Sequence, residues 1–350
     1  MREGGLRIAL TSIHSWPEVR RGAERYAHEL AAALAAAGHD VRLLSTGRPP
    51  RDRVLAVPVR RYRPRGRQGF GRLSSERVFG WQALAALAPA RLDVWHATST
   101  GDGAAAVVAG RVDRRLRTVF TDHGFPVRAS RQRRGDEVLH ARVVNGIGSY
   151  VCVSRAAGDW LARDFGREAA VVPPGVDSDR FTPGPGRADR PTVLYSGALD
   201  EPRKGVRDLV EAVRRIPGAA LWLVGPGSPD LSDLDTRHVT VRRSAAPEEM
   251  PELYRAAWVT ALPSTAEAFG MALVEALACG RPVVAREDAG GPAEIVTPET
   301  GALYDGSVAG LAEALQDVLA RPSTEACRAI GEGYDWRRRV VPALEELYRP

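Results

Sequence analysis

The stretch PSTAEAFGMALVEALACGRPVVA, residues 263–285, carries the most information about the fold. Apolar residues with helical spacing fill its middle, a glycine ends them, and the run PVVA that follows indicates a buried strand. Two glutamates, Glu267 and Glu275, lie eight positions apart, with Phe269 and Gly270 between them at the expected start of the helix. A helix start presents unpaired backbone N–H groups, which attract phosphate or sugar oxygens. The stretch therefore predicts a ligand-binding loop that opens a helix.

Both glutamates can bind hydroxyl groups from these positions. Glu267 precedes the helix, where its carboxylate would accept hydrogen bonds from a sugar. Glu275 lies roughly 12 Å further along the helix axis, where it would bind a second diol such as a ribose. In isolation, such a pair is better explained by a capping glutamate and a solvated helical glutamate. The rest of the chain therefore has to decide between these explanations.

Strand-like apolar runs alternate with amphipathic helical segments on both sides of this stretch. Near the N-terminus, LRIALTSI (residues 6–13) precedes a long helical segment and HDVRLLST (residues 39–46) follows it. Strands that are apolar on both faces and alternate with helices predict parallel sheets covered by helices. The sequence therefore predicts an α/β protein.

Proline and glycine gather at residues 177–191, and the strand–helix pattern starts again after them, which indicates an interdomain linker. The 350 residues are enough for two domains with a core each. We therefore expect an N-terminal domain over residues 1–180 and a second domain over residues 186–335. The last segment, residues 336–350, is expected to be a helix that packs back on the first domain.

Composition describes an ordinary globular protein. The hydrophobic content of 44% and the charged content of 26% are usual, and no apolar run reaches the roughly 18–20 residues that span a bilayer. The N-terminal MREGGLRIALTSIHSW does not resemble a signal peptide, because its apolar segment is short. Cys152, Cys279 and Cys327 lack metal-binding spacing, which predicts reduced thiols in a cytoplasmic protein.

Charge is distributed unevenly along the chain. Residues 1–185 hold 30 arginines against 18 acidic residues, a net +12, while the remainder carries −6; this asymmetry predicts that the N-terminal half meets an acidic partner or an anionic surface. Lys204, in LDEPRKG (residues 199–205), is the only lysine among 49 basic residues. An ammonium is a compact point charge that fits beside a single phosphate oxygen, unlike a wide guanidinium. This position is therefore a candidate for binding an anion.

Together, these segments resemble the retaining GT-B-type glycosyltransferases of family 4. The spacing Glu267-x7-Glu275 before EALACGRPVVA is the signature of that family. RRGAERYAHELAAALAAAGHDV resembles its glycine loop and first helix, TDHG its strand-end histidine, and VVPPGVDSDRFTP its domain junction. LDEPRKG resembles its diphosphate-binding segment, LWLVGPG the next strand, and AGGPAEIV the loop after the glutamate helix. The resemblance covers nearly the whole chain, and residues 48–90 are its least diagnostic part.

The resemblance implies a GT-B fold, in which two Rossmann-like domains with parallel sheets face each other across a cleft. It also implies a hexosyltransferase that moves a sugar from a nucleotide-diphosphate-sugar donor to a hydroxyl acceptor on a lipid, glycan or small molecule. Configuration would be retained, and no metal or other cofactor would be needed. The implied catalytic residues are His123, Glu267, Arg203 and Lys204. The implied donor-binding residues are Gly22, Gly197, Arg203, Lys204, Glu267, Phe269, Gly270, Met271, Ala272 and Glu275.

In this family the basic pair neutralises the diphosphate leaving group, so Arg203 and Lys204 would stabilise the charge that develops as the glycosidic bond breaks. His123 would contact the donor sugar from the N-terminal domain; a satisfied strand-end histidine is the alternative for this residue. The chain departs from the family at Gly197-Ala198, where Gly-Arg is usual. This removes one phosphate cation, for which Arg203 can compensate.

A second departure is Arg21-Gly22, where two glycines are common. Gly22 still lets backbone N–H groups approach the diphosphate, while Arg21 would narrow the cleft or bind a phosphate. His14 follows the first strand, where inverting enzymes of another family have their catalytic base; we expect it to line the cleft instead. Asp177-Ser178-Asp179 and Asp233-Leu234-Asp235 have the DxD pattern of metal sites, but their turn-like sequence predicts no metal.

Two alternatives to this function remain. A phosphorylase or nucleotide-sugar epimerase on the same fold is one, although no lysine lies in a pyridoxal-phosphate context. The other is a degenerate, non-catalytic family member that binds a nucleotide sugar or scaffolds an active partner. Ala198 favours this second alternative, whereas His123, Lys204 and the two glutamates oppose it.

Two basic stretches, residues 47–72 and 128–135, lie in expected loops of the N-terminal domain. An anionic lipid headgroup or a phosphorylated acceptor would suit them, and solvated loops of an arginine-rich protein explain them equally well. No aromatic platform or known module accompanies the charge, so we expect no nucleic-acid partner. We expect a cytoplasmic protein that can associate peripherally with the inner face of the membrane.

Overall fold

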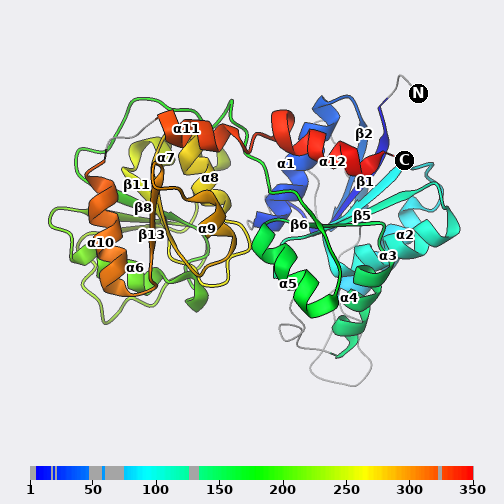
Figure 1. The fold of residues 1–350 in the computed structure, drawn as a ribbon, viewed down its shortest axis with the longest axis horizontal. Helices are drawn as coiled ribbons and strands as arrows, with labels where there is room; N and C mark the ends of the chain where they lie inside the picture. The colour runs from blue at the N-terminus through cyan, green and yellow to red at the C-terminus, as the bar shows by residue number, and fades with distance from the viewer. Residues whose placement is uncertain are drawn as a thin grey trace. The chain divides into compact units, whose positions relative to one another are not determined.

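The computed structural model of the chain describes residues 5–16, 19, 22–46, 57–59, 75–125, 134–321 and 325–349. Within these ranges the chain forms two compact α/β units (Figure 1). The first unit comprises Met1–Pro173 together with Trp336–Pro350, and the second comprises Pro174–Asp335. No helix in the described ranges is both long and apolar enough to cross a membrane.

The first unit is built on a parallel sheet whose described strands have the order β3-β2-β1-β4-β5-β6-β7. Its strands are β1 (Arg7–His14), β2 (Asp40–Thr46), β3 (Val57–Val59), β4 (Val94–Ala97), β5 (Arg117–Asp122), β6 (Ser149–Cys152) and β7 (Ala170–Val171). Its helices are α1 (Gly22–Ala36), α2 (Ser75–Leu87), α3 (Thr100–Val112), α4 (Arg134–Gly146), α5 (Arg155–Phe165), the π-helical turn η4 (Trp336–Val340) and α12 (Val341–Tyr348).

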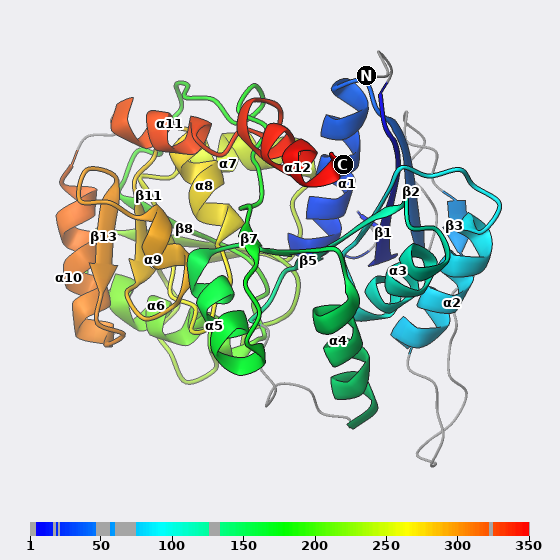
Figure 2. The ribbon, with the colours of Figure 1, turned by 45° about the vertical axis from the view of Figure 1, so that its right-hand side comes forward.

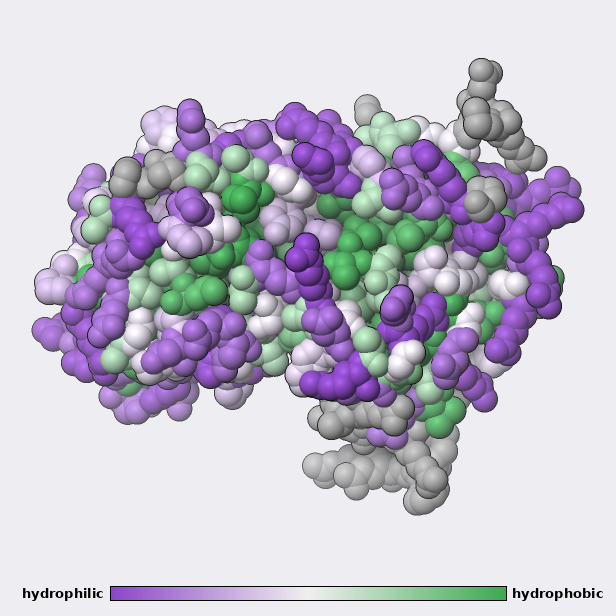
Figure 3. Space-filling model, in the orientation of Figure 1, coloured by the Kyte–Doolittle hydropathy of each residue, from purple (hydrophilic) through white to green (hydrophobic). Residues whose placement is uncertain are grey.

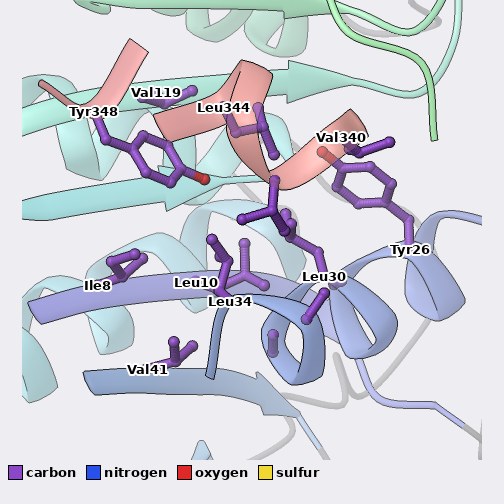
Figure 4. Packing of buried hydrophobic residues seen from close by; sticks show 14 of the residues in the cluster. Ile8, Leu10, Tyr26, Leu30, Leu34, Val41, Val119, Val340, Leu344 and Tyr348 are labelled. Carbon is purple, nitrogen blue, oxygen red and sulfur yellow. The ribbon is translucent and has the colours of Figure 1, made fainter. Parts of the chain in front are cut away.

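Each face of this sheet carries its own apolar core, because side chains alternate between the two faces along a strand. On β1, Ile8 and Leu10 pack into the cluster that contains α1 and the C-terminal α12. Ala9 instead belongs to the cluster formed with α2, α3, α4 and α5. Figure 2 shows α2 and α3 on the opposite side of the sheet from α1, and Figure 4 shows Leu344 and Tyr348 of α12 packed over the strands.

The second unit repeats this architecture with the strand order β10-β9-β8-β11-β12-β13 among the described residues. Its strands are β8 (Thr192–Ser196), β9 (Ala220–Val224), β10 (Val239–Arg242), β11 (Val259–Leu262), β12 (Val283–Arg286) and β13 (Gly301–Tyr304). Its helical elements are η2 (Pro202–Lys204), α6 (Val206–Arg214), η3 (Pro247–Glu249), α7 (Met250–Ala256), α8 (Met271–Ala278), α9 (Gly291–Ile295), α10 (Val308–Leu319) and α11 (Glu325–Glu332). The prediction of two parallel α/β units is therefore confirmed.

The division between the units falls at Pro173–Pro174, before the proline- and glycine-rich segment predicted to be a linker. That segment belongs to the second unit. Oγ of Ser178 donates a hydrogen bond to Asp335 at 2.5 Å, and Nε1 of Trp258 donates to the carbonyl of Ala188 at 2.8 Å. Proline and glycine indicated irregular backbone at this point, but the packing partners of that backbone lie far away in the sequence.

Hydrophilic residues cover most of the face drawn in Figure 3. The basic stretches predicted to meet an anionic partner lie almost entirely outside the described residues. Within these basic stretches, the structure describes only β3 and residues 134–135, at the start of α4.

Candidate active site

The topology of the second unit brings two of the predicted motifs together. The sheet reverses its order between β8 and β11, which are neighbouring parallel strands whose onward connections run to opposite sides. Loops that follow the carboxyl ends of strands at such a point form a binding crevice. The chain after β8 leads to Arg203 and Lys204, and the chain after β11 leads to Glu267. The segment predicted to bind the diphosphate and the glutamate predicted to bind the sugar therefore lie at one edge of the sheet.

Side chains from these two loops are in direct contact. Nζ of Lys204 donates a hydrogen bond to Oε2 of Glu267 at 2.5 Å, and only 13% and 19% of the two side chains are exposed. Nη1 of Arg203 lies 3.8 Å from the same oxygen, while its Nη2 pairs with Glu201 at 2.9 Å. Two cations and two carboxylates thus form one cluster, in which each charge has an opposite partner.

The backbone around the basic pair is fixed by a glycine. Arg203 and Lys204 lie in the short 3₁₀ turn η2, which ends at Gly205 with φ 66°. A Cβ atom at Gly205 would lie 2.6 Å from the carbonyl oxygen of Pro263, which no side chain tolerates. The loop after β11 also donates to this turn, from the amide of Thr265 to the carbonyl of Arg203 at 2.8 Å. Close backbone packing therefore sets the position of the ammonium group.

Glu267 is held by its backbone on both sides. Its amide donates to the carbonyl of Ala289 at 2.8 Å, and its carbonyl accepts from the amide of Gly291 at 3.0 Å. Among the described residues, Ala266 alone combines a side chain with a positive φ, of 51°. Such a conformation costs about 1–3 kcal/mol and occurs mostly at functional sites. The strained residue thus immediately precedes the predicted sugar-binding carboxylate.

The helix start behind Glu267 matches the sequence prediction. Helix α8 begins at Met271, and Gly270 is its N-cap with φ 105°. Phe269 is buried and packs its ring against Tyr334, with 5.5 Å between the ring centroids. Met271 and Ala272 are half-buried in the first turn. The contribution of this segment to a ligand therefore comes from its backbone N–H groups, because the Phe269 ring faces the protein interior.

Glu275 lies on the same helix but is 97% buried, with a relative exposure of 3%. The hydroxyl of Tyr254, on α7, donates to its Oε2 at 2.6 Å. The structure therefore brings Tyr254 to the second glutamate of the motif, a contact that the sequence did not reveal. A tyrosine at an apolar helical position resembles an ordinary core residue, so no sequence signal distinguished it.

After β8 the chain passes very close to β9. The amide of Gly197 donates to the carbonyl of Val224 at 3.0 Å, and a Cβ atom on Gly225 would lie 1.9 Å from the carbonyl oxygen of Gly197. The hydroxyl of Tyr195 donates to the carbonyl of Ala198 at 2.9 Å. Burial, together with the negative charge of Glu267, raises the pKa of Tyr195 well above its usual value. Tyr195 is therefore a neutral hydrogen-bond donor.

In the first unit, His123 directly follows β5. Its ring packs edge-on against Tyr26 of α1, with 4.4 Å between the ring centroids. Burial lowers the pKa of His123 to about 4, although the nearby Asp122 charge opposes this shift. Within the described part of the chain, its buried Nε2 has no hydrogen-bond partner. A neutral imidazole with an unsatisfied nitrogen is expected where a ligand supplies the missing partner.

The remaining N-terminal candidates lie at the ends of elements of the first unit. Gly22 is exposed and is the first residue of α1, while Arg21 lies outside the described residues. His14 is the last residue of β1 and is half-buried. The carboxyl end of β1, next to β4, is where the order of this sheet reverses. The topology therefore places His14 beside the position at which ligands bind in such sheets.

Both DxD-like triplets have other partners. The carboxylate of Asp177 accepts hydrogen bonds from the amides of Asp179 and Arg180, at 3.1 and 3.2 Å. Asp233 pairs with Arg207 at 2.7 Å. No group of three or more histidine, cysteine or carboxylate side chains in the described ranges is arranged to hold a metal ion. These triplets are turn and surface structures.

Comparisons with known proteins agree with this geometry. Residues 20–180 match the family model described as Glycosyltransferase Family 4, and residues 190–321 match the model described as Glycosyl transferases group 1. A GDP-mannose-dependent alpha-(1-6)-phosphatidylinositol monomannoside mannosyltransferase of Mycolicibacterium smegmatis is 34% identical over 288 residues, which are 70% of this chain and 75% of that protein. D-inositol 3-phosphate glycosyltransferase of the same species is 34% identical over 204 residues, covering 51% of this chain and 47% of that protein.

Solved structures show the same fold. Sucrose-phosphate synthase from Thermosynechococcus elongatus superposes with a TM-score of 0.76 at 24% identity, covering 97% of this chain and 96% of that one. The Anabaena HepE protein in complex with UDP and glucose gives a TM-score of 0.76 at 19% identity and covers 98% of both chains. The chain therefore has the GT-B fold and belongs to glycosyltransferase family 4, as an enzyme that uses a nucleotide-sugar donor.

Proposed function

We propose that this glycosyltransferase transfers its sugar with retention of configuration, to an anionic hydroxyl acceptor, without a metal ion. The observation that carries the proposal is the contact between Lys204 and Glu267, with Arg203 on the same carboxylate oxygen. It joins the cation of the diphosphate segment to the first glutamate of the E-x7-E pair, and that pair is the feature resembling retaining enzymes.

The basic pair supports departure of the nucleotide. A diphosphate leaving group gains negative charge as the glycosidic bond breaks, and fixed cations stabilise that charge without reorganising. Lys204 pairs with Glu267 and Arg203 pairs with Glu201. A diphosphate would compete with these carboxylates for both cations. The Arg203 side chain is 48% exposed, so it has room to turn toward the phosphate. It would then supply the positive charge that the family usually has at the position of Ala198.

The other roles follow from the same placement. Glu267 and the backbone N–H groups of the Phe269–Ala272 segment would bind the sugar hydroxyls. Glu275, oriented by Tyr254, would bind the ribose of the nucleotide. His123 is neutral, its Nε2 has no hydrogen-bond partner among the described residues, and it would accept a hydrogen bond from, or donate one to, the donor sugar.

The relatives suggest which substrates to test. The relative of which this chain covers 75% is named for GDP-mannose and a phosphatidylinositol mannoside. We propose GDP-mannose as the donor and an inositol-containing anionic lipid as the acceptor. The net charge of +12 over residues 1–185 supports an anionic acceptor on this part of the chain.

A panel of GDP-, UDP-, ADP- and TDP-sugars, scored by thermal shift, tests the donor. A donor at 100 times its Kd should stabilise the protein by roughly 2.7 kcal/mol. The protein is then incubated with that donor and phosphatidylinositol vesicles, with and without EDTA, and the glycoside is examined by NMR. We expect the donor's anomeric configuration in the product and the same rate in EDTA. An inverted product would instead make His14 the general base, and loss of activity in EDTA would show that a metal takes part.

A further inference from the structure

Among the described residues, no hydrogen bond fixes the direction of the His123 ring. Its Nε2 has no partner within the described part of the chain, and its ring packs against that of Tyr26, with 4.4 Å between the ring centroids. Tyr26 is fully buried. The Tyr26 ring is therefore a surface against which the imidazole of His123 is oriented.

Tyr26 is in turn the end of a buried chain of hydrogen bonds. Its hydroxyl lies 3.4 Å from Oγ1 of Thr121, which lies 2.7 Å from Nε2 of His96 on β4. Nδ1 of His96 lies 2.6 Å from the hydroxyl of Tyr348, on α12. His96, Thr121 and Tyr26 have no measurable exposure, and Tyr348 is 1% exposed. These buried hydrogen bonds thus run from the C-terminal helix to Tyr26, whose ring packs against His123.

We call the hydrogen bonds that link Tyr348, His96, Thr121 and Tyr26 the relay. At any time, all its hydroxyl and N–H groups donate in the same direction along it. Burial lowers the pKa of His96 to about 3, so the imidazole is neutral and carries one N–H. One of its nitrogens must donate while the other accepts. If Tyr348 donates to Nδ1, then Nε2 donates to Thr121, whose hydroxyl donates to Tyr26; the opposite order is the other possibility. Loss of one hydroxyl leaves a buried polar atom unsatisfied and breaks the relay.

The C-terminal segment also reaches Tyr26 at its other end. The ring of Trp336 lies 5.4 Å from that of Tyr26, and its Nε1 donates to Glu29 of α1 at 3.0 Å. Figure 4 shows Tyr26 and Tyr348 on opposite sides of the cluster around Leu344, with both hydroxyls directed inward. The C-terminal segment therefore packs directly on Tyr26 through Trp336 and is linked to its hydroxyl through Tyr348, His96 and Thr121.

We propose that Tyr348 is a positioning residue for His123, acting through His96, Thr121 and Tyr26. The inference rests on the proposed function in one respect, the role of His123 at the donor sugar. Tyr348 itself touches no substrate; it sets the ring that presents the imidazole.

The test compares Tyr348→Phe, which removes one hydroxyl and leaves the ring, with Leu344→Val, which shortens a buried side chain of the same helix outside the relay. With the donor that the panel identifies, Tyr348→Phe should lower kcat roughly 2- to 12-fold, the rate equivalent of one hydrogen bond, and leave KM unchanged. Leu344→Val should lower the melting temperature and leave kcat unchanged. Thr121→Val interrupts the relay at its middle and should reproduce the Tyr348→Phe result; it replaces Tyr348→Phe if that protein does not fold.

A double-mutant cycle separates positioning from general damage. In a His123→Ala background, Tyr348→Phe should have no further effect on kcat; an effect that multiplies with that of His123→Ala would overturn the inference. A second readout does not depend on activity. In protein labelled with ¹⁵N-histidine, which has seven histidines, the ring signals of His123 should shift in Tyr348→Phe and stay in place in Leu344→Val.

The two hypotheses can fail separately. If His123→Ala leaves kcat unchanged, the proposed role of His123 at the sugar is wrong, and the relay is judged by the NMR signals alone. If His123→Ala lowers kcat while Tyr348→Phe and Thr121→Val change neither kcat nor the His123 signals, the relay is wrong and the role of His123 stands.

Discussion

Lys204 and Arg203 are neighbours with the same charge and very different surroundings. The lysine side chain is 13% exposed and reaches Glu267 between two loops, whereas the arginine side chain is 48% exposed and spans Glu201 and Glu267. The compact ammonium group of lysine fits the enclosed position of residue 204, and the planar guanidinium group of arginine suits the more exposed position of residue 203. The single lysine of an arginine-rich chain thus occupies the more enclosed of the two positions.

We expect Lys204→Ala to lower turnover about 10²- to 10³-fold, because a fixed donor to developing negative charge is worth roughly 3–4 kcal/mol. The fold should persist, since the contacts of η2 and Gly205 are made by the backbone. Arg207→Ala is the matched control: it removes a cation of α6 that pairs with Asp233, and turnover should not change. Steady-state kinetics at saturating donor measure both. Near-normal turnover of Lys204→Ala would remove Lys204 from the leaving-group role.

At the residue scale, the sequence pointed to individual candidate residues but not to the side chains packed around them. The resemblance pointed to Lys204 and Glu267, and the structure places them in contact. It did not point to Tyr254 beside Glu275, or to Tyr26 beside His123. Both tyrosines occupy buried helical positions, where an aromatic residue predicts core packing. Which polar group a buried tyrosine meets depends on the packing of another element, and periodicity does not encode that.

At the scale of elements, the apolar runs identified the strands well. LRIALTSI corresponds to β1 and HDVRLLST to β2, because a strand buried on both faces is largely apolar. For the segment at residues 177–191, predicted to be a linker, the composition specifies irregular backbone and nothing more. Its attachment to the second unit depends on Ser178 meeting Asp335, a contact between residues 157 positions apart.

Strand β4 carries a testable pH dependence through His96. The pKa of this residue is about 3 in the folded protein, against the ordinary 6.5, so between these values the unfolded chain binds more protons. Stability from His96 is therefore complete above about pH 6.5 and is lost as the pH falls toward 3. The pKa of His123, about 4, acts in the same direction. Asp102 acts in the opposite direction, because burial raises its pKa to about 7.

We expect His96→Gln to weaken the acid sensitivity of the first unit. Each such group contributes at most about 1.4 kcal/mol per pH unit, so from pH 6.5 to 4.5 the wild-type protein should lose up to about 2.7 kcal/mol more stability than the variant. Urea unfolding at several pH values measures this difference in slope, which is separate from the lower absolute stability of the variant. Equal slopes would mean that His96 does not remain neutral in the folded protein.

At the scale of the whole molecule, the repetition of one strand–helix pattern predicted two units with parallel sheets, and the structure confirms them. The charge difference between the halves also belongs to this scale, because it is a sum over many side chains and no single residue carries it. The chain also returns to its first unit after residue 335, where the sequence led us to expect a helix over residues 336–350 that packs on that unit. The surface that receives this helix is a different matter, because composition does not describe the complementary apolar surface between α1 and the sheet.

That return predicts what removal of the C-terminal segment would do. Five side chains of this segment are almost completely buried in the first unit: Trp336, Val340, Val341, Leu344 and Tyr348. Each contributes roughly 1.5–3 kcal/mol by leaving water, so together they approach the total stability of about 5–15 kcal/mol that a domain has. We expect a chain that ends at Asp335 to lose the first unit, seen as insoluble expression or loss of its melting transition. A chain that ends at Tyr348 keeps all five side chains and should melt as the full chain does. A soluble protein ending at Asp335, with an unchanged melting temperature, would show that the sheet holds α1 without them.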